Sequence, residues 1–330
     1  MSLPVLAPPA RPRLPAAVRS LASMASNSAR WKLFGHGALL KPLFVSWEIN
    51  SACNLRCPYC YIHDRSYGFS DRGLAFDKIK IVLGRIAKVC PDIMLLGGEP
   101  FLHPEWDRIV DYCCDHLGLR VRCITNGTLL EKHLAATGRL SLLVVSDDQT
   151  RQKLYPKQMT DMKRQLERVA ATYPNLTILV NFVLCADDDP AWLIERFHAL
   201  TEQGLNLFVN VDRYFGRQIK RRTGRVHMTD ATLDWLSDTR RPVPFCNPTL
   251  LPLLDPQANL IYPCCYYNEQ TAGSLADTDY HDLMTRSAER FGQYPFDKCD
   301  ACTTTAYLDA SVATRRPIEA VRHYHSLYNR

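Results

Sequence analysis

Apolar residues in the middle of the chain alternate between short continuous runs and longer periodic stretches. The short runs are rich in β-branched and aromatic side chains, and they predict strands at residues 44–49, 93–98, 119–127, 140–146, 176–184 and 205–212. The periodic stretches predict helices at residues 74–89, 105–117, 159–173 and 191–204. Strands that alternate with helices need crossover connections and therefore form a parallel sheet. The pattern predicts an α/β fold, a partial (β/α)6 TIM-like barrel rather than a full barrel of eight units.

This alternation ends near residue 230. Prolines gather between residues 242 and 263, and five cysteines stand at positions 246, 264, 265, 299 and 302. Such a stretch predicts a small, loop-rich unit held together by its cysteines. We therefore divide the chain into an N-terminal arm at 1–42, the partial barrel at 43–230 and a cysteine-rich C-terminal domain at 231–330.

The N-terminal arm is basic. Residues 1–42 contain six lysines and arginines and no acidic residue. One interpretation is a partly disordered arm that packs on the barrel. A second is a basic amphipathic segment in peripheral contact with anionic lipid. A third is a plastid-type transit peptide.

Composition narrows the function classes. Hydrophobic residues make up 46% and charged residues 22% of the 330, as in an ordinary globular protein. A net charge of +6 does not favour nucleic acid as the main partner. Prolines and arginines interrupt any secretory signal near the N-terminus, so we expect a cytoplasmic protein. In that compartment the thirteen cysteines are expected to bind metal or do chemistry rather than form disulfides.

Three of these cysteines, Cys53, Cys57 and Cys60, directly follow the first predicted strand. Chemistry in (β/α) folds sits at the carboxyl ends of the strands. Other glycine and polar residues lie at the ends of the later strands: Gly97-Gly98-Glu99, Thr125-Asn126-Gly127, Ser146-Asp147-Asp148, Asn181 and Asp212. A loop with three thiolates can bind three corners of a cubane iron–sulfur cluster and leave the fourth iron open. The sequence therefore predicts one shared site at this rim.

The loop Cys53-Asn-Leu-Arg-Cys57-Pro-Tyr-Cys60 resembles the cluster loop of the radical S-adenosylmethionine (SAM) enzymes. The GGEP at 97–100, the TNG at 125–127 and the serine that ends the fourth strand also match, and the resemblance covers about residues 43–215. It implies that the three cysteines ligate a [4Fe-4S] cluster whose open iron chelates SAM. After Ser146 the family often continues Leu-Asp-Gly, whereas this chain reads Asp-Asp-Gln.

The resemblance also implies the residues that contact SAM. Gly97, Gly98 and Glu99 match the motif that receives the methionine amino group. Tyr59 would lie near the adenine, and Asn126 belongs to the matched TNG. Ser146 and Asn181 match positions that contact the ribose or the carboxylate. Other residues at strand ends could face the substrate: Asp147, Asp148, Asn210, Asp212, Arg213 and Tyr214.

The C-terminal cysteines resemble the auxiliary-cluster region of the SPASM/twitch radical SAM enzymes. The resemblance implies one auxiliary [4Fe-4S] cluster held by Cys246, Cys264, Cys299 and Cys302. Cys265 is an alternative to Cys264, and a structural zinc site is an alternative to the cluster. The remaining cysteines are interpreted as core thiols.

The expected function is that of a radical SAM enzyme. Reductive cleavage of SAM yields a 5′-deoxyadenosyl radical that abstracts hydrogen from a small natural product or a lipid. The auxiliary cluster would assist oxidation or bond formation, and a flavodoxin or ferredoxin would donate electrons. One alternative is a peptide-modifying enzyme that matures ribosomally made peptides. Another is a non-catalytic iron–sulfur or zinc-binding protein.

Overall fold

The computed structural model describes residues 14–34, 39–65, 71–182, 189–202, 207–210, 247–264 and 270–292, with a few isolated positions. The predicted domain boundary at 230/231 lies outside the described residues. So do Cys246, Cys265, Cys299 and Cys302, together with the strand-end residues Asp212, Arg213 and Tyr214.

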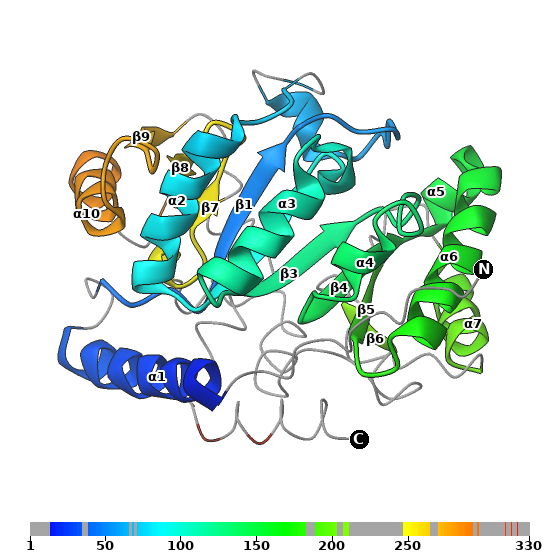
Figure 1. The fold of residues 1–330 in the computed structure, drawn as a ribbon, viewed down its shortest axis with the longest axis horizontal. Helices are drawn as coiled ribbons and strands as arrows, with labels where there is room; N and C mark the ends of the chain where they lie inside the picture. The colour runs from blue at the N-terminus through cyan, green and yellow to red at the C-terminus, as the bar shows by residue number, and fades with distance from the viewer. Residues whose placement is uncertain are drawn as a thin grey trace.

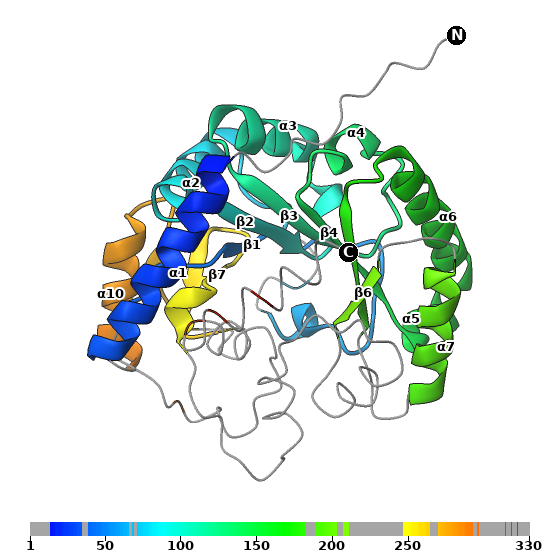
Figure 2. The same ribbon diagram turned by 90° about the horizontal axis from the view of Figure 1, so that it is seen from below.

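Six parallel strands form the centre of the molecule, and each pairs with its neighbour in chain order. They are β1 (Val45–Asn50), β2 (Asp92–Gly97), β3 (Arg120–Thr125), β4 (Leu142–Asp147), β5 (Thr177–Phe182) and β6 (Leu207–Asn210). Figure 2 shows them as an open arc with helices on its outer side. The predicted partial barrel is confirmed, and every predicted strand is present.

Four of the described helices follow the predicted stretches within a few residues. Those that match a prediction are α2 (Phe76–Val89), α3 (Trp106–Asp111), α6 (Pro156–Thr172) and α7 (Pro190–Thr201). Four further helices of the described residues were not predicted: α1 (Leu14–Phe34), α4 (Leu134–Thr137), α5 (Gln149–Leu154) and α10 (Tyr280–Phe291). The predicted helix at 105–117 divides into α3 and a π-helical turn at Tyr112–His116. The helix predicted from residue 159 begins three residues earlier, because Pro156 has a backbone angle suited to a first turn.

The two faces of the sheet have different contents. Alternate strand residues such as Trp47, Ile49 and Leu95 are fully buried against the outer helices, in one large core cluster. The concave face carries a smaller apolar cluster that includes Met94 and Leu179. At the amino ends of the strands this face holds buried charge, because Asp92 pairs with Arg120 and Arg122. Apolar side chains and a paired charge therefore line the amino-terminal half of the concave face.

Three short strands extend the sheet beyond β1. They are β7 (Leu253–Leu254), parallel to β1, and then β8 (Asn259–Ile261) and β9 (Thr271–Ser274), which are antiparallel to their neighbours. Leu254 and Leu260, with Leu283 from α10, belong to the same core cluster as β1 and α2. The described part of the C-terminal region thus continues the sheet and core of the barrel.

Residues 14–34 form helix α1, within the segment for which the sequence predicted a partly disordered arm that packs on the barrel or a basic amphipathic segment. Figure 1 shows α1 beneath the end of the sheet at which β1 begins. The fully buried Asn27 donates to the Lys41 carbonyl (2.7 Å) and accepts from the Lys41 amide (2.8 Å). Trp31 packs on a small cluster of Leu40, Leu250 and Leu251. Among the described residues no helix has both the length and the apolar character needed to cross a bilayer.

We predict that Asn27→Ala detaches α1 from the barrel. The substitution leaves the amide and carbonyl of Lys41 without their partners, at a cost of about 1–3 kcal/mol. Amide hydrogen exchange within α1 should accelerate, while exchange in β1–β5 stays slow. Ser28→Ala, one residue along the same helix, is the matched control. Unchanged exchange in the Asn27→Ala protein would show that α1 is held by other contacts.

Candidate metal centre

The cysteine loop leaves β1 at the carboxyl edge of the sheet, and its cysteines are sheltered from solvent. Cys57 is buried, while Cys53 and Cys60 are partly buried. Burial raises the pKa of the Cys53 thiol to about 11 and also raises the pKa of Cys60. Two of the three thiols therefore resist ionisation, and a bound cation would have to drive the loss of their protons.

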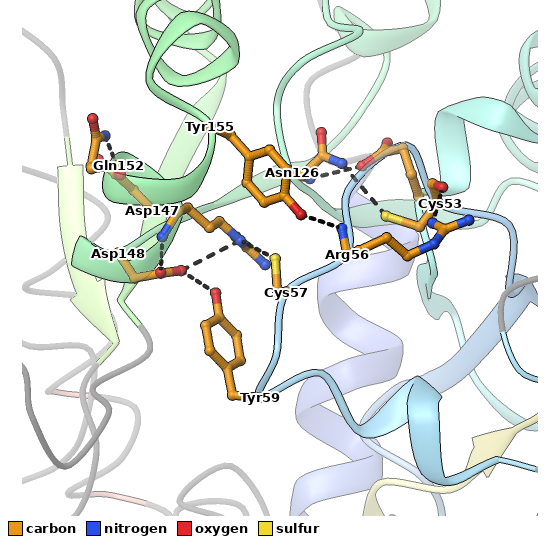
Figure 3. A network of polar contacts seen from close by, with 11 residues as sticks. Cys53, Arg56, Cys57, Tyr59, Asn126, Asp147, Asp148, Gln152 and Tyr155 are labelled. Atoms are coloured by element: carbon orange, nitrogen blue, oxygen red, sulfur yellow. Dashed lines mark hydrogen bonds and ion pairs between the residues drawn. The ribbon is translucent and has the colours of Figure 1, made fainter.

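Two of the sulfurs receive N–H donors. The Leu55 amide lies 3.4 Å from Cys53 Sγ, and Asn126 Nδ2 lies 3.9 Å from the same sulfur. Arg151 Nε lies 3.3 Å from Cys57 Sγ (Figure 3). Hydrogen bonds to sulfur are typical of thiolates that ligate iron–sulfur clusters. The loop thus presents its sulfurs to groups that favour their charged form.

Gly97, the last residue of β2, and Gly98, which follows it, lie against the start of this loop. The Gly98 amide donates to Asn50 O (3.0 Å), and the Glu99 amide donates to Ala52 O (2.8 Å). A Cβ on Gly97 would lie 2.1 Å from Asn50 O, and one on Gly98 would lie 2.2 Å from Ser51 O. The absence of a side chain at these two glycines therefore lets the backbone at the end of β2 pack closely against the backbone at the start of the cysteine loop.

The Glu99 side chain is fully buried and ties β2 to β3. Its carboxylate accepts from Thr125 Oγ1 (2.7 Å), the Asn126 amide (2.8 Å) and the Phe101 amide (3.2 Å). Burial raises the pKa of Glu99 to about 7, although all three hydrogen bonds act in the opposite direction. Its carboxylate is therefore occupied by protein donors.

Asn126 connects the hydrogen bonds of Glu99 to the cysteine loop. Its side-chain amide also donates to Asn54 Oδ1 (2.9 Å), and its oxygen accepts from the Thr128 amide (3.0 Å). Asn54 in turn donates to Thr128 Oγ1 (2.8 Å). Asn126 is thus held against Cys53 by hydrogen bonds to Asn54 and to Thr128.

A buried ion pair holds the far end of the loop. Arg65 Nη2 lies 3.3 Å from Glu48 Oε1, and both side chains are almost completely buried. Tyr61, in the short 3-10 turn Tyr61–Asp64, donates to the same carboxylate oxygen (2.8 Å). Since Glu48 belongs to β1, the strand that begins the loop also anchors its end.

Tyr59 and the residues after β4 meet at the second cysteine. The Tyr59 hydroxyl donates to Asp148 Oδ2 (2.5 Å), and Asp148 pairs with Arg151 (3.4 Å). Asp147 points the other way, toward the helices, where Arg196 Nε lies 2.8 Å from its Oδ2. Both aspartates therefore contact protein groups in this structure.

Ser146 and Asn181 are register partners on β4 and β5, and Asn210 of β6 is the register partner of Asn181. Adjacent residues in register lie side by side on one face of a sheet. Because Val145 belongs to the helix-facing core, Ser146 lies on the concave face. The structure thus places the two predicted SAM contacts, Ser146 and Asn181, next to each other on β4 and β5.

Arg151 is the site residue that the sequence reasoning missed. A weak signal was present, because an acidic residue directly after a strand favours a helix start, and Arg151 lies three residues further on. Its contact with Cys57 joins residues 94 positions apart, so no local pattern indicates it. Tyr155, whose hydroxyl accepts from the Arg56 amide (2.8 Å), was missed for the same reason.

Residues 47–147 match the family model of the Radical SAM superfamily, a range that contains the cysteine loop and the GGEP motif. This stretch of the chain therefore matches a radical SAM domain, in agreement with the resemblance of its cysteine loop.

Curated relatives share parts of the chain. GTP 3′,8-cyclase of Chlorobaculum tepidum is 29% identical over 59% of this chain and 61% of its own length. AdoMet-dependent heme synthase of Methanosarcina barkeri is 37% identical over 27% of this chain and 25% of its length. The subtilosin biosynthesis protein AlbA of Bacillus subtilis is 33% identical over 28% of this chain and 20% of its length. The matches thus span about three-fifths or less of these relatives, two of which are named as enzymes.

Solved structures confirm the fold. SuiB of Streptococcus suis bound to S-adenosylmethionine has a TM-score of 0.61 at 15% identity, covering 88% of this chain and 77% of SuiB. SuiB bound to the precursor peptide SuiA has a TM-score of 0.58 at 14% identity, covering 81% of this chain and 68% of SuiB.

We predict that Gly98→Ala displaces the cysteine loop. The added Cβ would meet two carbonyl oxygens, Ser51 O at 2.2 Å and Ala52 O at 2.5 Å. We expect a loss of about 1–3 kcal/mol in the free energy of unfolding and less iron bound per chain. The matched control is Gly84→Ala in α2, where a Cβ meets nothing within 4 Å and alanine favours the helix. Equal iron content in the two variants would contradict this assignment.

Glu99 makes stability depend on pH. With its pKa raised from 4.5 to about 7, the folded chain keeps a proton that the unfolded chain loses between those values. The free energy of unfolding should therefore fall as pH rises through this window. Glu99→Gln should lower the free energy of unfolding at every pH, because an amide NH2 then faces protein donors. The substitution should also reduce the pH dependence of this free energy within the same window. Urea unfolding at pH 5 to 8 measures the free energy of unfolding and its pH dependence. If this free energy changes with pH as steeply in Glu99→Gln as in the wild type, Glu99 is not the source of the pH dependence.

Proposed function

We propose that the protein is a radical SAM enzyme in which Cys53, Cys57 and Cys60 bind a [4Fe-4S] cluster with one open iron for SAM. The observation that carries this proposal is the cysteine loop itself. It stands at the carboxyl edge of a six-stranded parallel barrel, with N–H donors aimed at two of its sulfurs. Sites at this edge are the rule for such barrels.

The residues present fit such a cluster in two respects. Arg151 Nη1 is buried and has no hydrogen-bond partner among the described residues, so it offers positive charge to a group held by thiolates. Within the described part of the chain, no three His, Cys, Asp or Glu side chains converge as a single metal ion requires. A cluster is bound differently, because each thiolate binds a different iron, and Cys53, Cys57 and Cys60 supply three thiols from one loop.

When bound, the cluster and SAM supply a 5′-deoxyadenosyl radical, which abstracts a hydrogen atom from the substrate. The chain holds and shields that chemistry. Glu99 and Asn126 fix the loop, while Leu96 and Ile124 pack against the concave cluster and give the barrel interior an apolar lining.

The proposed SAM contacts follow the resemblance. Ser146 and Asn181, side by side on the concave face, are proposed to contact the ribose or the carboxylate. Gly97, Gly98 and Glu99 are proposed to receive the methionine amino group through their main chain, because the Glu99 carboxylate already accepts three protein donors. Tyr59 is proposed to lie near the adenine, with its hydroxyl anchored on Asp148.

A second [4Fe-4S] cluster is proposed on Cys246, Cys264, Cys299 and Cys302, of which only Cys264 is described. Cys264 follows β8, which runs antiparallel to β7, and packs on the cluster of Leu40, Leu250 and Leu251 before β1 and β7. It thus lies at the amino end of the barrel, whereas Cys53 lies past the carboxyl end. A six-residue strand spans about 20 Å. This separation favours an auxiliary cluster that accepts an electron over one that ligates the reacting part of a small substrate.

The proposed substrate is a small natural product or a lipid, with a flavodoxin or ferredoxin as electron donor in the cytoplasm. A second candidate is a peptide substrate. It is favoured by the match to AlbA, which is named for the biosynthesis of the bacteriocin subtilosin. Lipid contact through the basic residues of 1–42 stays a prediction.

Replacing Cys53, Cys57 and Cys60 by alanine should remove about four irons per chain and abolish 5′-deoxyadenosine formation. Iron and sulfide analysis after anaerobic reconstitution, with dithionite and SAM, measures both. Cys114→Ala is the matched control, since this partly buried thiol lies in the turn after α3. Wild-type protein that binds zinc alone, or that cleaves no SAM, would support the non-catalytic alternative.

Replacing Cys299 and Cys302 by alanine should remove a second set of irons and leave uncoupled SAM cleavage intact. Because the proposed auxiliary cluster accepts an electron, product formation should stop. Full turnover in this variant would show that the second site has another role.

A further inference from the structure

The guanidinium of Arg151 lies between a cysteine and an aspartate. Its Nε is 3.3 Å from Cys57 Sγ and 3.4 Å from Asp148 Oδ2. The Asp148 side chain is completely buried, and that of Arg151 is 13% exposed. A charge-assisted hydrogen bond in such a sheltered position is stronger than one at the surface.

Asp148 organises this contact with both carboxylate oxygens. Oδ1 accepts from the Arg151 amide (2.8 Å) and begins helix α5, while Oδ2 faces the guanidinium and the Tyr59 hydroxyl. Figure 3 shows Tyr59 and Cys57 on the loop, with Asp148 across from them on the segment after β4. One carboxylate therefore fixes a helix start, an arginine and the cysteine loop together.

Removal of positive charge or of an N–H donor from a cluster sulfur changes the energy of the reduced state. Hydrogen bonds to sulfur and net charge are the main factors by which a protein sets a cluster potential. Because reduction adds negative charge, a guanidinium against Cys57 stabilises the reduced cluster more than the oxidised one.

We propose that Arg151 is a positioning residue, held by Asp148, that raises the reduction potential of the cluster through Cys57 Sγ. The proposal rests on the function proposed above. It also gives a role to the Asp-Asp-Gln that follows Ser146, the point at which this chain departs from the usual family sequence. Asp148 positions the arginine instead of contacting the substrate.

The test is a potentiometric titration of the anaerobically reconstituted full chain with dithionite, followed by electron paramagnetic resonance. At a fixed potential, Arg151→Met should lower the ratio of reduced to oxidised cluster about tenfold, a shift of about 59 mV for one electron. Arg151→Lys keeps the positive charge, so the ratio of reduced to oxidised cluster should fall by less than in Arg151→Met. Lys153→Met removes an exposed charge from the same helix and should leave the ratio unchanged.

Asp148→Asn decides how Asp148 acts, because asparagine still begins a helix well. Removal of a negative charge should raise the potential if Asp148 acts only through its charge. If Asp148 holds Arg151 on the sulfur, the potential should fall instead, and the signal of the reduced cluster should broaden.

The outcomes separate the two proposals. A wild-type chain that binds no reducible cluster overturns the proposed function. A normal cluster whose potential is the same in wild type and Arg151→Met overturns the role of Arg151 alone. A higher potential in Asp148→Asn overturns the positioning role of Asp148.

Discussion

The anchoring of the cysteine loop is the constraint on which the rest of this site depends. Residues 51–60 contain no helix or strand, so the loop has no hydrogen-bond ladder of its own. It is held at its start by the main chain of Gly98 and Glu99, and at its end by the buried pair of Glu48 and Arg65. Contacts from Asn126, which follows β3, and from Arg151, which follows β4, reach its first two cysteines. A loop fixed in this way keeps its sulfurs in place before any cofactor arrives.

The buried charges around the cysteine loop are balanced. Two buried carboxylates, Glu99 and Asp148, lie beside three thiols in a region with little access to water. Glu99 is compensated by three hydrogen bonds and Asp148 by Arg151. Since buried charge is costly unless it is paired, the fold itself requires the arginine beside Asp148.

The barrel has two chemically different ends. At the amino end, α1, the cluster of Leu40, Leu250 and Leu251, and the pairing of Asp92 with two arginines occupy the described surface and interior. At the carboxyl end, residues after β2, β3 and β4 contact the cysteine loop, and Ser146 and Asn181 lie in register on β4 and β5. This difference follows from parallel topology, which collects all the βα loops at one edge. It also means that Cys264, next to the amino end, is a strand length from the loop.

The six strands, four of the helices and the cysteine loop follow from the sequence alone, because hydrophobic periodicity is local and the loop has an unusual spacing. Helices α1, α4, α5 and α10 were not predicted. Helix α1 packs through Trp31 on residues that precede β1 and β7, and α10 contributes Leu283 to the core that also contains β1 and α2. The roles of Glu99, Asn126 and Arg151 were decided only in three dimensions. Arg151 and Cys57 are 94 residues apart, and only the order of the strands brings them together. Sequence patterns indicate which groups can do chemistry; the fold determines which of them touch, because those contacts depend on the paths of several strands at once.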